Sequence, residues 1–137
     1  MDKKFLVPFK TAQQLKEKGY PQEGATMYYD TFSGGEISLI TDRECVSCVV
    51  DGNDRHPLFK RLSELYIAAP TYHEVLDWLD SQGIYINCFA PTRKRDVGRY
   101  ISSFYNNNTG YWSTCKYNST TREGALNMAI IAALEML

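Results

Sequence analysis

Four cysteines are the residues best suited to chemistry in this sequence of 137 residues. Cys45 and Cys48 have the CxxC spacing of a zinc knuckle, and Cys88 with Cys115 could complete a set of four thiolates around the metal. The valines around the CxxC pair favour a strand instead, and residues three apart on a strand point to opposite faces. Buried, inert cysteines are therefore the favoured interpretation, with zinc as the alternative. We expect neither a metal nor a cofactor.

The other candidate catalytic residues lack suitable partners. His56 lies in a polar loop, and His73 lies on the solvent side of a predicted helix. Neither histidine has a cysteine, serine or carboxylate at a spacing that a fixed local geometry would bring within hydrogen-bond reach. Asp77 and Asp80 share a helix face and could act as a carboxylate pair. A solvent-exposed charged face explains both residues without a catalytic role. The glycine pair at 34 and 35 precedes a strand rather than a helix, so it does not form a phosphate loop. The sequence therefore predicts that the chain is not an enzyme.

Composition and charge are those of an ordinary globular protein. Charged residues make up 23% and hydrophobic residues 44%, and the formal net charge of -1 gives no overall attraction to nucleic acid or anionic membranes. The N-terminus has only a three-residue apolar run before Pro8, which is too short for a signal peptide. We therefore expect a cytoplasmic protein with reduced thiols and no membrane contact. The length predicts a single domain over residues 1–137, with a candidate sub-boundary near residues 66–70.

The clearest element is a predicted helix over residues 71–82. Thr71 and Glu74 have capping-box spacing, in which the threonine hydroxyl accepts from the Glu74 N–H and the carboxylate accepts from the Thr71 N–H. Gly83 supplies the positive φ that ends such a helix. Its apolar stripe consists of Tyr72, Val75, Leu76 and Leu79.

Three strands and a last helix are predicted after this helix. Residues 84–90 alternate as a strand does, and the β-rich runs 99–105 and 111–117 form a hairpin, because the Asn and Gly residues at 106–110 tolerate the left-handed conformation. Thr120 with Glu123 makes another capping box, which predicts a helix that runs to residue 137. Between residues 124 and 137 only Asn127 and Glu135 are polar. This helix is therefore either central to the core or partly a subunit interface.

The N-terminal half is predicted to add a short helix and further strands. Thr11 and Gln14 repeat the capping-box spacing, and Gly19 ends the helix. Extended patterns at residues 27–29, 37–40 and 45–50 predict two or three antiparallel strands. Residues 58–69 are ambiguous between a short helix and an extended segment.

These patterns together predict an α+β fold with a mainly antiparallel sheet. Residues 71–137 should follow the order α-β-β-β-α, with both helices packed on one face of the sheet. The N-terminal helix and its two or three strands would extend or cover that sheet.

Aromatic residues in the predicted strands are a candidate interaction face. Each lies on one parity of its strand, so a single sheet face could carry them all. If exposed, this face could stack bases or hold an apolar ligand. We favour the alternative in which the N-terminal strands or a second subunit cover it, because an exposed aromatic patch promotes aggregation. The five residues are Tyr85, Phe89, Tyr100, Phe104 and Trp112.

Motifs spread along the chain carry a resemblance to known proteins. The run Ala-Pro-Thr at residues 69–71 leads into a helix with Trp78 and Leu79, an aromatic hairpin follows, and the last helix opens with Thr-Arg-Glu-Gly-Ala-Leu at residues 121–126. This combination resembles uncharacterised small proteins carried by Bacteroides-type gut bacteria and their prophages. The resemblance covers most of the chain and implies a cytoplasmic accessory protein of mobile-element origin, without catalytic residues.

Residues 71–137 also resemble double-stranded-RNA-binding domains in length and element order. The last helix is similar to the closing helix of that family through Ala125, Ala129, Ala133 and Leu134. The resemblance implies RNA contacts from the first inter-strand loop and from the start of the last helix. Six basic residues in this segment are balanced by six acidic residues, so the charge gives little support for binding to the phosphate backbone. The candidate nucleic-acid-binding residues are Arg93, Lys94, Arg95, Arg99 and Arg122.

The sequence thus leads to two functional hypotheses. The first is a non-catalytic protein-interaction or regulatory module that self-associates through the last helix or the aromatic sheet face and binds a protein partner yet to be identified. The alternative is a nucleic-acid-binding protein with a double-stranded-RNA-binding-like domain.

Overall fold

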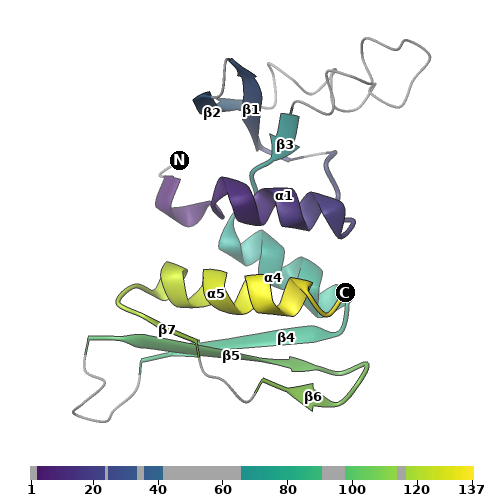
Figure 1. Ribbon diagram of the computed structural model, residues 1–137, viewed down its shortest axis with the longest axis vertical. Helices are drawn as coiled ribbons and strands as arrows, with labels where there is room; N and C mark the ends of the chain where they lie inside the picture. The colour runs from purple at the N-terminus through teal and green to yellow at the C-terminus, as the bar shows by residue number, and fades with distance from the viewer. Residues whose placement is uncertain (1–2, 24, 34–35, 42–65, 91–97, 114–116) are drawn as a thin grey trace. The chain divides into compact units, whose positions relative to one another are not determined.

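The chain divides into two compact units, each with its own sheet. The computed structural model describes residues 3–23, 25–33, 36–41, 66–90, 98–113 and 117–137 (Figure 1). One unit is Leu6–Pro70, and the other consists of Met1–Phe5 with Thr71–Leu137. The junction at residues 70 and 71 adjoins the predicted sub-boundary, and the single-domain organisation stays a prediction.

The Leu6–Pro70 unit combines one helix with a three-stranded antiparallel sheet. Its elements are α1 (Phe9–Glu17), β1 (Met27–Ser33), β2 (Glu36–Thr41) and β3 (Tyr66–Ala68), and the strand order is β2-β1-β3. The predicted N-terminal helix and the predicted strands at 27–29 and 37–40 are confirmed. The ambiguous segment 58–69 is extended at β3, and the predicted strand at 45–50 lies outside the described residues.

Helix α1 begins three residues earlier than the sequence pattern predicts. Its N-cap is Pro8, which lacks an N–H and has φ -60, while Thr11 is buried inside the helix, so the predicted Thr11 capping box is wrong. The Phe9 ring packs edge-to-face on Tyr29 at 5.4 Å, and the Tyr29 hydroxyl donates to the Val7 carbonyl at 2.6 Å. Because Phe9 has this tertiary contact, we attribute the early helix start to packing rather than to a side-chain cap.

The second unit has the predicted order of a helix, antiparallel strands and a closing helix, but with four described strands in place of the predicted three. After a 3-10 turn η1 (Lys3–Phe5) come α4 (Tyr72–Ser81), β4 (Ile84–Phe89), β5 (Tyr100–Asn106), β6 (Tyr111–Trp112), β7 (Tyr117–Ser119) and α5 (Arg122–Leu134). The predicted strand 111–117 corresponds to β6 and the start of β7. All pairings are antiparallel, and both β6 and β7 pair with the edge of β5 opposite β4. Both helices lie on one face of this sheet (Figure 1), so the predicted α+β fold is confirmed. No helix in the described parts of the chain is long and apolar enough to cross a membrane.

Helix α4 has the start and stop signals that the sequence predicts. Thr71 Oγ1 accepts from the Glu74 N–H at 3.2 Å, and Glu74 Oε1 accepts from the Thr71 N–H at 3.2 Å. Gly83 ends the helix with φ +82, and Asn108 Nδ2 in the hairpin loop donates to the Gln82 carbonyl at 2.8 Å. The capping box thus fixes the start of α4, and the hairpin loop donates a hydrogen bond to a backbone carbonyl at the end of the helix.

Helix α5 packs along the sheet as a core element. Its N-cap is Thr121 rather than Thr120, because the Thr121 hydroxyl accepts from the Gly124 N–H at 3.0 Å. The helix contacts β4, β5 and β7. Six of its residues are buried, namely Ala125, Leu126, Ala129, Ile130, Ala133 and Leu134, whereas Met128 remains exposed. The core interpretation of this apolar helix therefore holds for these six residues, and a subunit interface on α5 stays a prediction.

Candidate functional site

Strand register assigns alternate residues of β4 to β7 to two opposite faces. Ile86 pairs with Phe104 and Cys88 with Ser102, and the buried Ser102 hydroxyl donates to the Ala125 carbonyl of α5 at 2.5 Å. These residues therefore lie on the helix side. We call this the covered face; its members on β4 and β5 are Ile84, Ile86, Cys88, Tyr100, Ser102, Phe104 and Asn106.

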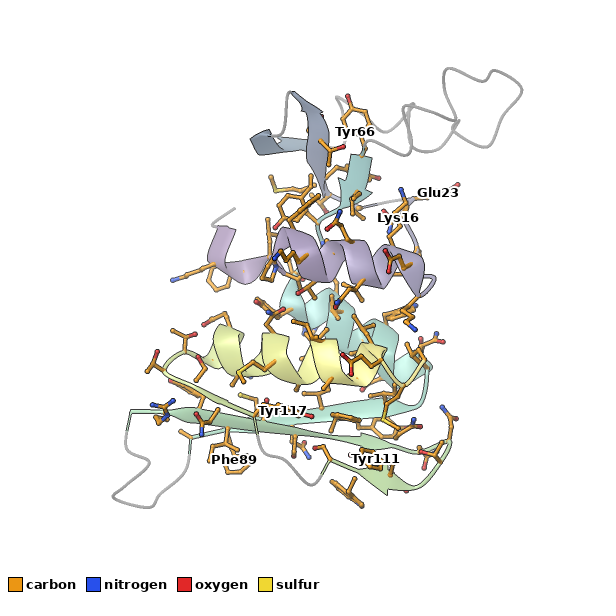
Figure 2. The ribbon with its side chains drawn as sticks, viewed as in Figure 1. Lys16, Glu23, Tyr66, Phe89, Tyr111 and Tyr117 are labelled. Carbon is orange, nitrogen blue, oxygen red and sulfur yellow. The ribbon has the colours of Figure 1, made fainter. Side chains whose placement is uncertain are left out.

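The other set of alternate residues forms the opposite face of the same strands, which we call the open face. Its residues are Tyr85, Asn87, Phe89, Ile101, Ser103, Tyr105, Trp112 and Asn118. The residues Tyr85, Phe89 and Trp112 are 44, 45 and 58% exposed. Figure 2 shows Phe89 on the side of the sheet away from α4 and α5. In the single chain these three side chains are accessible, and coverage of this face by a second subunit stays a prediction.

The five aromatic residues predicted from the sequence do not share one face. Tyr85, Phe89 and Trp112 lie on the open face, but Phe104 is 2% exposed on the covered face, and Tyr100 shares that face. The single-face prediction is wrong because the alternation within one strand does not show which residues of the neighbouring strand lie on the same face. The pairing register shows this: Tyr85 pairs with Tyr105 rather than with Phe104, so Phe104 lies on the other face.

The open face has three cross-strand rows. The first is Tyr85–Tyr105–Trp112, in which the Tyr105 and Trp112 rings pack at 4.6 Å with an interplanar angle of 33°. The second pairs Asn87 with Ser103, and the third is Phe89–Ile101–Asn118. Rings therefore lie at both ends of the face, with amide and hydroxyl groups between them.

A single described cation borders this face. Arg99 directly precedes β5, and its Nε and Nη2 atoms donate to Asn118 Oδ1 at 3.2 and 2.8 Å. This hydrogen bonding orients the guanidinium beside the third row. In the described part of Thr71–Leu137 the acidic residues all lie on the helices or at a helix cap: Glu74, Asp77, Asp80, Glu123 and Glu135. The open face itself has no acidic residue among the described positions.

The predicted nucleic-acid-binding residues are not brought together as one described cluster. Arg93, Lys94 and Arg95 lie outside the described residues. Arg99 adjoins the open face, whereas Arg122 is at the start of α5, on the helix side of the sheet. The structure therefore separates the two arginines that it describes.

The only cysteine that the structure describes is Cys88, on the covered face. Burial raises the pKa of its thiol; the Arg122 guanidinium opposes this shift, and the Glu123 carboxylate adds to it. Cys45, Cys48 and Cys115 lie outside the described residues. Within the described ranges there is no group of three His, Cys, Asp or Glu side chains that could hold a metal ion.

His73 has a partner that the sequence analysis missed. Its Nε2 atom lies 3.4 Å from Asp77 Oδ2, one helical turn along α4, and both side chains are exposed. The i,i+4 spacing is the signal that could have found this pair. An exposed His–Asp pair on a helix is a surface interaction.

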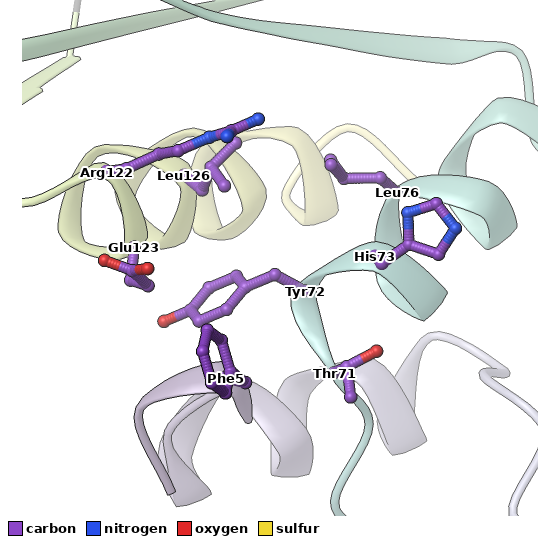
Figure 3. A pocket seen from close by; sticks show the side chains of 8 residues that line it. All are labelled: Phe5, Thr71, Tyr72, His73, Leu76, Arg122, Glu123 and Leu126. Carbon is purple, nitrogen blue, oxygen red and sulfur yellow. The ribbon is translucent and has the colours of Figure 1, made fainter. Parts of the chain in front are cut away.

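A pocket of about 250 Å³ lies between the starts of α4 and α5 (Figure 3). Phe5, Tyr72, Leu76 and Leu126 supply apolar walls, and the polar lining comes from Thr71, His73, Arg122 and Glu123. The Thr71 hydroxyl and the His73 ring already have protein partners, and the volume is below the roughly 300 Å³ at which ligand pockets usually begin. The open sheet face is therefore the stronger candidate site.

Sequence analysis missed the open-face residues Tyr105, Asn87 and Asn118. The signal that could have found them is the hairpin register, in which Asn106 pairs with Tyr111 and so Tyr105 with Trp112. That register also reveals the ring pair that adjoins Tyr85.

Comparison with protein-family models, with curated proteins and with solved structures yields no match to this chain. The relationships to prophage-associated proteins and to double-stranded-RNA-binding domains therefore stay predictions. The candidate site is supported by its own geometry.

Proposed function

We propose that this chain is a non-catalytic interaction module whose binding surface is the open face of the β4–β5–β6 sheet. The observation that carries the proposal is the exposure of Tyr85, Phe89 and Trp112 on one face of a sheet whose other face is buried under helices. Large exposed apolar patches rimmed by polar residues mark interaction sites on folded domains. Aromatic residues are also the side chains most enriched at binding surfaces.

A photo-crosslinking experiment tests this proposal in cells that express the full chain. The photoreactive residue p-benzoylphenylalanine replaces Trp112 on the open face or Tyr111 on the opposite side of the same strand; both native side chains are exposed, at 58 and 42%. We expect a discrete covalent adduct from position 112 and little from position 111. Equal crosslinking from both positions, or none from position 112, would overturn the proposal.

Self-association is part of the proposal, and α5 offers a surface for it. Met128 is exposed on α5, away from the six buried residues of the helix, so a second copy could pack there without changing the core. Sedimentation velocity over a range of protein concentrations should show a dimer that Met128→Glu dissociates and Trp112→Glu does not. A monomer at every concentration would remove self-association and leave the open-face proposal intact.

A further inference from the structure

We infer that the occupant of the open face is a short stretch of single-stranded nucleic acid, two or three nucleotides long. The inference rests on the proposed function, because it names the partner of that same surface. Of the two described arginines among the candidate nucleic-acid-binding residues, the site includes Arg99, whereas Arg122 lies on the other side of the sheet at the start of α5.

The size of the open face argues against a second protein as its main occupant. β4 and β5 have six and seven residues, and β6 and β7 add two and three residues beside β5. With strands about 4.8 Å apart and about 3.3 Å per residue, these strands give a flat face of roughly 300 Å². A stable protein interface buries about 800 Å² on each partner. The face is thus less than half as large as a specific dimer needs, but it matches sheets that stack two or three bases.

The chemistry of the face suits exposed bases. The Tyr105–Trp112 pair is held at 4.6 Å, so its rings are ordered before a ligand binds, and Tyr85 adjoins them in the same row. Phe89 is four residues from Tyr85 along β4, about 13 Å away. Two stacking positions are therefore separated by Asn87 and Ser103, whose polar groups can hydrogen-bond to base edges.

Charge also favours a polyanion on this side of the unit. The described acidic residues of Thr71–Leu137 lie on or at the ends of α4 and α5, whereas the open face is bordered by Arg99. Asn118 orients that guanidinium beside the Phe89 row, where it can contact a phosphate. Since stacking provides most of the contacts and the described face has one cation, a single strand should bind better than a duplex, whose bases are not accessible to rings.

Fluorescence anisotropy with labelled 12-nucleotide probes tests the inference on the full-length protein. The probes are single-stranded RNA, single-stranded DNA of the same sequence and the corresponding duplexes. We expect saturable binding to one or both single strands and at least tenfold weaker binding to the duplexes; the preferred strand identifies the source of the ligand. No binding to either single strand, or equal binding to single strand and duplex, would overturn the inference.

Two neighbouring aromatic residues provide a matched pair of variants. Trp112→Ala should weaken single-strand binding about tenfold, because stacking on one ring is lost, whereas Tyr111→Ala on the opposite side should change affinity less than about twofold. Circular dichroism verifies that both variants fold. Equal effects of the two substitutions would contradict the inference.

Salt dependence isolates the contribution of Arg99. Each phosphate contact to a single strand contributes a slope of about -0.7 to the dependence of log K on log salt. Arg99→Gln should therefore make the slope less negative by about 0.7, and an unchanged slope would remove Arg99 from the site. An adduct at position 112 whose mass is unchanged by nuclease treatment would overturn the nucleic-acid inference while the proposed interaction function stands; absence of any adduct there would overturn both.

Discussion

The covered and open faces of the β4–β5–β6 sheet are made by alternate residues of the same strands, but their surroundings differ. Phe104 lies under the helices and is 2% exposed. Tyr105, which follows it in β5, pairs with Trp112, and Trp112 is 58% exposed. The comparison shows that aromatic character alone does not reveal whether a residue stabilises the fold or is available to a partner. Substitutions on the covered face should reduce stability, and substitutions on the open face should reduce binding.

The largest difference is expected between Phe104→Ala and Tyr105→Ala. Phe104 is buried and stacks with Tyr117 at 6.4 Å, so its truncation should lower the free energy of unfolding by about 3–5 kcal/mol. Tyr105→Ala removes a half-buried ring pair and should lower it by about 1 kcal/mol. Urea unfolding followed by circular dichroism measures both values. Similar losses would show that the open face contributes to stability as the covered face does.

Gly124→Ala is expected to sharpen the comparison on the covered side. Alanine is the better helix former by about 1 kcal/mol, but its Cβ would meet Ser119 Oγ of β7 and lie 2.8 Å from Thr121 Oγ1. The expected net result is a loss of about 1–2 kcal/mol in thermal or urea unfolding, because overpacking outweighs propensity. Adding Ser119→Ala should recover part of the loss. A gain in stability would mean that α5 is not tightly packed on β7.

Adjacent serines provide a smaller test. Ser102 is buried and donates to the Ala125 carbonyl, so Ser102→Ala should cost about 1 kcal/mol in urea unfolding. Ser103 lies on the open face, and Ser103→Ala should stay within about 0.5 kcal/mol of the parent chain. Equal effects would contradict the assignment of these two residues to different environments.

The smallest expected effect concerns Cys88. Burial raises the pKa of its thiol, so alkylation of this residue, followed by peptide mass spectrometry, should reach half its maximal rate at a higher pH in the folded chain than in urea. Glu123→Gln should lower that pH, because the carboxylate adds to the shift. The thiol stays protonated to a higher pH in the folded state than in the unfolded state. The folded state therefore loses stability as the pH rises above about 8.5, the ordinary pKa of a cysteine thiol. Identical titrations in the folded and unfolded chains would show that Cys88 is not shielded.

Local signals in the sequence predicted much of this fold. The Thr71–Glu74 capping box and Gly83 define α4 within a residue or two, since each acts through contacts only a few residues apart. The Asn-rich loop likewise predicted the hairpin between β5 and β6. The fold class follows from such elements and their order.

The candidate site depends on relations that a linear pattern does not contain. The register of β4 against β5 assigns Tyr105 to the open face and Phe104 to the covered face, and a shift of one residue would exchange them. The helix start at Phe9 depends on its packing against Tyr29. His73–Asp77 was within reach of the sequence, because i,i+4 spacing alone brings the pair together.

The division of the chain into two units has a consequence for protein engineering. Because Met1–Phe5 groups with Thr71–Leu137, the Leu6–Pro70 unit is flanked at both ends by residues of the other unit. The two ends of the Leu6–Pro70 unit lie close together, since the Val7 N–H donates to the Pro70 carbonyl at 3.0 Å. Segments whose ends are adjacent are suitable sites for exchange or circular permutation. Exchange of the Leu6–Pro70 unit is therefore a route to altering this chain while the sheet with the open face is kept.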